Sequence, residues 1–136
     1  MKKAGQIGVE YLIVIAFVTF IVLTTFTLGI YYSGAIKDKI VSDQIENFAY
    51  NLINSAESVF FAGEPSEITL NLYLPSSVSN ITIQNDGIVI TSETSSGINV
   101  RFFESRVPLS GTISPTPGNK ILKLKALSDR VEIVLP

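Results

Sequence analysis

An uncharged apolar segment near the N-terminus constrains this chain more than any other feature of its sequence. Residues 11–36 contain no Asp, Glu, Lys or Arg; Lys2 and Lys3 stand upstream, with a single carboxylate, Glu10, in between. About 20 apolar residues at roughly 1.5 Å each span the ~30 Å hydrocarbon layer of a bilayer. Placing a carboxylate in lipid costs roughly 2.5–3.5 kcal/mol, and a simple anchor has no use for one. We therefore expect a helix that enters the membrane and must later leave it and find a partner.

The remaining composition argues against several classes of function. The chain contains no cysteine and no histidine, so disulfides, thiolate ligands and the commonest general base are all missing. The carboxylates of the C-terminal half are scattered, without the spacing of a catalytic pair or a calcium loop. We therefore predict no enzymatic activity, no metal and no cofactor. Ten basic and 12 acidic residues give a net charge of −2 without a basic block, so nucleic acid is not an expected partner.

The flanks of the apolar segment predict its orientation. Lys2 and Lys3 favour a cytoplasmic N-terminus and an exported C-terminal part, which the mixed flank at residues 37–39 opposes only weakly. A cleaved secretory signal is one alternative, because Ser33-Gly34-Ala35 offers a small-x-small site, but the apolar core of residues 11–32 exceeds the usual 7–15. A permanent single-pass anchor is the second alternative. The third alternative depends on the residues beyond position 36.

More helix is expected after the apolar segment. Between Ile36 and Phe60 apolar residues recur at three- and four-residue steps, and polar residues occupy the opposite face. No proline precedes Pro65, so one helix can run from Gly8 to about Phe61, over roughly 80 Å at 1.5 Å per residue. Gly63 and Pro65 are expected to end it.

The chain after Pro65 is rich in strand patterns. Glu67–Leu74 alternates apolar and polar residues, which is typical of a half-buried strand. Asp86-Gly87 is a strong hairpin-turn signal between two apolar runs. Residues 109–118, rich in Ser, Gly and Pro, are expected to form a loop. The strands are predicted at 67–74, 81–83, 88–90, 98–104, 121–127 and 131–135. The predicted fold class is α+β: one long N-terminal helix and a small antiparallel β-sandwich or barrel packed on its C-terminal half.

The N-terminal residues also resemble a known family. A short basic leader, then Ala4-Gly5 before Gln6, then Glu10 ahead of Tyr11-Leu12 and a long apolar helix, is similar to a type IV pilin precursor. More narrowly, residues 6–12 resemble the class III signal peptide of archaeal pilins. In that family a prepilin peptidase cuts ahead of the apolar segment, here between Gly5 and Gln6. Gly8 stands where the archaeal motif often has Ser, and the lack of a cysteine pair favours the archaeal branch.

The resemblance implies a division of the chain and a function. Residues 1–5 would be a cleaved leader, 6–63 the long helix and 66–136 a strand-rich outer domain. The chain would be a structural subunit of an extracellular pilus-like filament that serves surface adhesion. Its partners would be the membrane before assembly, the prepilin peptidase, the assembly machinery and further copies of the chain. The precursor would lie in the cytoplasmic membrane, and the mature subunit in a filament at the cell surface.

We expect the N-terminal helix to carry the assembly contacts. Cleavage removes two lysines, changes the net charge from −2 to −4 and exposes an amino group on Gln6, which Glu10 would offset within a subunit or in the next one. A charged pair in an apolar bundle fixes register even where it adds little stability. The alternative is that Glu10 stays wet at the headgroup boundary. The residues expected to pack in the filament core are Leu12, Ile13, Phe17, Phe20, Ile21 and Phe26.

Two other functions fit the same pattern. An archaellin-like subunit of a motility filament shares the plan of helix and sandwich, and a monomeric single-pass surface protein would use its outer domain for binding. Asn80-Ile81-Thr82 is a sequon for N-glycosylation beside an expected turn, so Asn80 is a candidate modification site on an exported surface.

Overall fold

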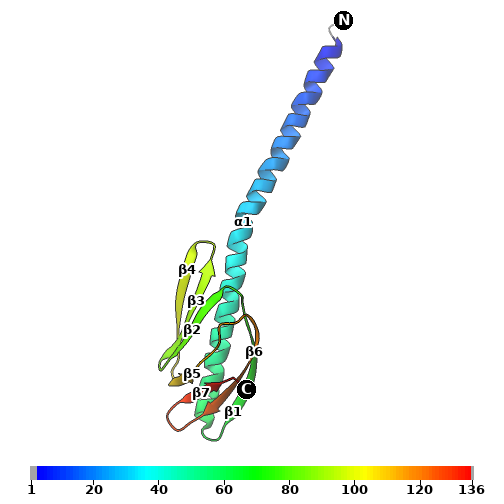
Figure 1. The fold of residues 1–136 in the computed structure, drawn as a ribbon. Helices are drawn as coiled ribbons and strands as arrows, with labels where there is room; N and C mark the ends of the chain where they lie inside the picture. Colours follow the sequence, from blue (N-terminus) through cyan, green and yellow to red (C-terminus); the bar gives the residue numbers. More distant parts are fainter. Residues whose placement is uncertain (1–2, 136) are drawn as a thin grey trace. The chain divides into compact units, whose positions relative to one another are not determined.

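The computed structural model describes residues 3–135, and the side chains from residue 8 onward. Two compact units make up the chain: one ends at Lys37, and the other comprises Asp38–Pro136. One long helix, α1, is followed by seven strands, so the predicted α+β class is confirmed (Figure 1). The elements are α1 (Lys3–Ala62), β1 (Glu67–Leu74), β2 (Val78–Gln84), β3 (Gly87–Thr94), β4 (Gly97–Glu104), β5 (Leu109–Gly111), β6 (Gly118–Ala126) and β7 (Val131–Val134).

The end of α1 is set by the residues that sequence analysis singled out. Gly63 has a φ of 78° and donates its backbone N–H to the carbonyl of Phe60, at 3.0 Å. A left-handed residue at this position closes a helix at little cost only when it is glycine. Pro65 follows two residues later and cannot continue the helical hydrogen bonds. The helix therefore stops within a residue of its expected end.

The strands form two sheets within the second unit. One sheet has the order β1-β6-β7-β5 and the other β2-β3-β4. All pairs are antiparallel except β5 with β7, which are parallel. The expected loop at residues 109–118 was wrong at both ends, because Leu109–Gly111 forms β5 and Gly118 begins β6. Leu109 is buried there and pairs with Val131 of β7, a partner distant in sequence.

One hydrophobic core joins both sheets to the second half of α1 in this unit. From Ile45 to Val59 the apolar stripe of the helix is buried, as its three- and four-residue spacing predicted, whereas Ile36 and Ile40 at its start are exposed. Lys123 and Lys125 point away from this core, while their neighbours Leu122 and Leu124 are buried. The helix contributes Ile45, Phe48, Ala49, Leu52, Ile53 and Ala56, and the strands contribute, among others, Leu74, Ile88, Ile90, Phe103, Leu122, Leu124 and Val131.

A second, polar contact fixes the β3–β4 hairpin on the helix. The carboxylate of Asp38 accepts hydrogen bonds from the backbone N–H and the hydroxyl of Ser95, at the hairpin turn. Arg101 of β4 donates to the Ser42 hydroxyl at 2.9 Å and to the Glu46 carboxylate at 2.5 Å. These helix residues recur every four positions and so lie on one face. The polar contacts therefore tie the hairpin to three successive turns of the helix.

Candidate functional site

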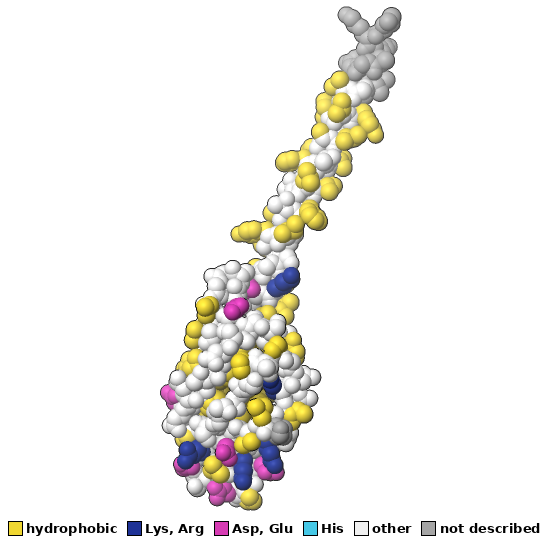
Figure 2. Space-filling view, viewed as in Figure 1, with side chains coloured by type: hydrophobic (Ala, Val, Ile, Leu, Met, Phe, Trp, Pro, Cys, Tyr) yellow, Lys and Arg dark blue, Asp and Glu magenta, His cyan; other side chains and the backbone are white. Residues whose placement is uncertain are grey.

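The first unit presents an apolar surface on every side of its helix. The large side chains from Val9 to Ile36 are all exposed, with 67% of Leu12 and Phe20 and 69% of Phe26 accessible. In Figure 2 hydrophobic side chains protrude along this part of α1. Covering one such side chain is worth about 1.5–3 kcal/mol, so covering this surface is worth on the order of 20 kcal/mol or more. An exposed apolar surface of this extent marks a place that lipid or other apolar side chains can cover.

The apolar part of α1 is long enough to cross a bilayer. Its stretch from Gly8 to Ala62 contains a window of 18 residues with a mean hydropathy of 2.5. By length and composition this helix can cross a membrane, and it can serve as a membrane anchor. A bundle of neighbouring apolar helices would cover the same side chains equally well.

Hydroxyl groups in the apolar segment bond to the helix itself. Thr24, Thr25 and Thr27 donate to the backbone carbonyls four residues earlier, at 2.8–2.9 Å. A hydroxyl satisfied within its own helix can enter an apolar environment without leaving a donor unpaired. These threonines therefore do not disturb the apolar character of the segment.

Glu10 is the exception to this apolar surface. It is exposed, and it forms no ion pair with the residues that the structure describes. Gly5 and Gln6 belong to α1, but the Gln6 side chain lies outside the described part, as do Met1 and Lys2 altogether. The predicted cleavage after Gly5 and the pairing of Glu10 with Gln6 both remain predictions. The six residues predicted to pack in a filament core are all exposed on the helix: Leu12, Ile13, Phe17, Phe20, Ile21 and Phe26.

The sequon lies on the outer face of the β2-β3-β4 sheet. Asn80 is exposed, and its amide nitrogen donates to the Thr82 hydroxyl, at 3.4 Å. Asn80 pairs with Thr91 of β3, which in turn pairs with Val100 of β4, so the three lie in one row across the sheet. The Asn80 side chain is therefore open to a modifying enzyme if the domain is exported.

The described residues include no group of three or more acidic side chains that could hold a metal ion. The polar contacts at Asp38, Arg101 and Ser95 were missed by sequence reasoning, because their partners are more than 50 residues apart.

No protein-family model, no curated protein and no solved structure matches the chain.

Proposed function

We propose that this chain is a structural subunit of an extracellular filament of the type IV pilus kind, polymerised through its N-terminal helix. The observation that carries the proposal is the exposed apolar surface of residues 9–36, which surrounds the helix and contains no charge after Glu10. Such a surface can be covered by lipid before assembly and by neighbouring copies of the same helix afterwards.

The position of Glu10 distinguishes the proposal from a plain anchor. An anchor gains nothing from a carboxylate within its apolar helix, whereas a polymer of parallel helices can use one to set the register between copies. Within lipid, apolar helices gain little by associating, because the lipid tails are as apolar as leucine. A polar contact between copies would supply the specificity that apolar packing lacks.

The second unit supports a structural role. Its core includes the second half of α1, so the folded domain is carried directly by the helix that would polymerise. Its glycosylation sequon is exposed, as suits the surface of an exported protein. We propose that the precursor lies in the cytoplasmic membrane with its N-terminus inside, and that the mature chain lies outside the cell, where the filament serves adhesion.

Mass spectrometry of the chain purified from its native membrane or surface fraction tests the proposal. We expect a mature chain that begins at Gln6, found in fibres visible by negative-stain electron microscopy. A chain that keeps its first five residues and remains in the lipid fraction would instead support a permanent anchor. A chain that begins after Ala35 would support a secreted protein.

A further inference from the structure

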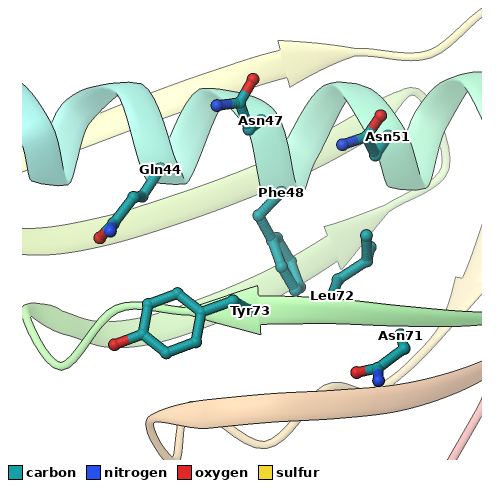
Figure 3. Close-up of a pocket in the computed structure, with 7 residues that line it drawn as sticks. All are labelled: Gln44, Asn47, Phe48, Asn51, Asn71, Leu72 and Tyr73. Carbon is teal, nitrogen blue, oxygen red and sulfur yellow. The ribbon is translucent and has the colours of Figure 1, made fainter.

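A hollow lined by side-chain amides lies between the helix and the edge strand β1 of the second unit. Its volume is about 380 Å³, within the range of small-molecule sites. Helix α1 contributes Gln44, Asn47 and Asn51, at three- and four-residue steps, while β1 contributes Asn71 and Tyr73 from one face (Figure 3). Phe48 and Leu72 also line it, so the hollow has an apolar part.

The polar lining is uncharged and has unused hydrogen-bonding capacity. No Asp, Glu, Lys or Arg lines the hollow. Within the described part of the chain, the side chains of Gln44, Asn47, Asn51 and Asn71 make no hydrogen bond to another protein group. Each side-chain amide offers two donors and a carbonyl acceptor. The three helix amides therefore stand along one side of the hollow with their donors and acceptors open to a ligand, whereas the Asn71 side chain points away from the helix (Figure 3).

Helix propensity does not explain these residues. Asparagine in a helix interior is less favourable than alanine by up to about 0.7 kcal/mol, and Lys or Glu would serve better on a solvated face. Asn47 and Asn51 nevertheless occupy two successive turns beside the hollow.

The lining chemistry selects the class of ligand. Anions are bound by Arg, Lys or helix N-termini, and hard cations by carboxylates; the hollow has none of these. Neighbouring hydroxyls of a sugar, each a donor and an acceptor, match side-chain amides. Tyr73, 52% exposed, presents an apolar ring with a polar hydroxyl, which suits the C–H face and the hydroxyls of the same molecule. We propose that this hollow binds a neutral carbohydrate.

A peptide strand is the competing occupant, because β1 is an edge strand of its sheet with unpaired backbone groups. Strand addition draws its affinity from the backbone and would not need a row of amides on the facing helix. The carbohydrate proposal does not rest on polymerisation, since all seven lining residues belong to the unit Asp38–Pro136. It would give a filament subunit a means of adhesion.

Saturation-transfer NMR on the full chain tests the proposal, with the chain held unassembled in a polyoxyethylene detergent that contains no sugar. The probes are methyl glycosides and disaccharides of glucose, galactose, mannose and N-acetylglucosamine, with glucuronic acid as the charged comparison. We expect at least one neutral probe to bind with a Kd in the millimolar range, as is usual for a few hydrogen bonds and one ring contact. Glucuronic acid should bind more weakly.

Matched variants locate the binding. Asn51→Ala and Tyr73→Ala should each weaken binding roughly 3- to 10-fold, the effect of losing one or two hydrogen bonds or the ring. Asn54→Ala, an exposed asparagine one turn further along the helix and outside the hollow, should leave the Kd within about twofold. Circular dichroism of every variant checks that the fold is retained.

Three results would overturn the proposal. The first is the absence of saturation transfer for every neutral probe at about 20 mM. The second is a loss of binding in Asn54→Ala equal to that in Asn51→Ala. The third is binding of an extended octapeptide that is retained in Asn51→Ala while no sugar binds. Because the measurement uses unassembled chain, sugar binding without fibres would contradict only the proposed filament. Fibres without sugar binding would contradict only this inference.

Discussion

Replacing Leu52 with alanine tests whether the second half of α1 is part of the core of the strand-rich unit. Leu52 is fully buried and lies in one cluster with side chains of both sheets. If the helix were only a support on which a separately stable sandwich rests, the substitution would have little effect on unfolding of the strands. If the helix is a structural layer of the unit, the substitution should destabilise all of it.

The magnitude is set by the burial. Leu→Ala removes three carbon atoms, worth about 2.4 kcal/mol at roughly 0.8 kcal/mol each. A residual cavity adds about 24 cal/mol per Å³, so that roughly 40–80 Å³ of unfilled space contributes roughly 1–2 kcal/mol. We therefore expect a loss of about 3.5–4.5 kcal/mol in the free energy of unfolding. For a unit of about 100 residues this lowers Tm by roughly 15–25 °C.

The absence of native cysteine makes the assay direct. Val131→Cys, a change similar in volume at a fully buried strand position, introduces the only thiol of the chain. Labelling of that thiol in urea then reports unfolding of the strands, while the apolar segment stays in a detergent micelle. Leu52→Ala and Asn54→Ala are each compared with the Val131→Cys chain. Asn54 is exposed on the same helix, so its replacement should change the free energy of unfolding by less than about 0.5 kcal/mol.

A loss below about 1 kcal/mol for Leu52→Ala, similar to that of Asn54→Ala, would refute this reasoning. It would mean that the two sheets hold together without the helix. The strand-rich unit would then be separable from the segment that we propose to polymerise.

Three further predictions concern single contacts. Glu10→Gln should lower the yield of fibres at least about tenfold without changing the processing or the stability of the chain. Glu93→Gln, which alters an exposed carboxylate on β3, should leave the yield of fibres unchanged. Normal fibres from Glu10→Gln would contradict the pairing hypothesis. A double-mutant cycle of Glu46→Ala and Arg101→Ala should give a coupling of about 1 kcal/mol in the free energy of unfolding. The same cycle on the more exposed Glu67–Lys123 pair should give less than about 0.5 kcal/mol. Equal couplings for the two pairs would contradict the role of the polar contact. Gly87→Ala should lower the free energy of unfolding in urea by about 2 kcal/mol or more, because a Cβ there meets the Phe103 carbonyl and the Phe102 ring. Gln84→Ala at the paired position is the control. An equally small loss for both variants would show that the hairpin can shift to make room for the Cβ.

The elements that sequence predicted well are those encoded locally. The helix from Lys3 to Ala62 reflects an uninterrupted apolar pattern that turns amphipathic, and its end is set by Gly63 and Pro65. Alternation over Glu67–Leu74 and the Asp86-Gly87 signal likewise placed β1 and the β2–β3 hairpin, whose connection is Asn85-Asp86. In each of these cases the period or the turn residue lies within the segment itself.

The features that sequence missed depend on distant partners. Strand β5 has only three residues and forms by parallel pairing with β7, so no local sequence pattern predicts it. The contact of Arg101 with Glu46 and the amide-lined hollow, to which Asn51 and Asn71 both contribute, join residues far apart in the chain. The predicted cleavage at Gly5 and the role of Glu10 rest on a motif, and only processing and assembly experiments can test them.

Electron cryomicroscopy of fibres sheared from the surface of cells that express this chain tests the central claim most directly. We expect lipid-free fibres in which the helical segment of residues 9–36 lies at the fibre axis, with side chains such as Phe20 and Phe26 packed against neighbouring copies and Glu10 close to the amino group of Gln6. Recovery of the chain only in the lipid fraction, with no fibre that contains it, would contradict the account and identify the segment as a membrane anchor alone.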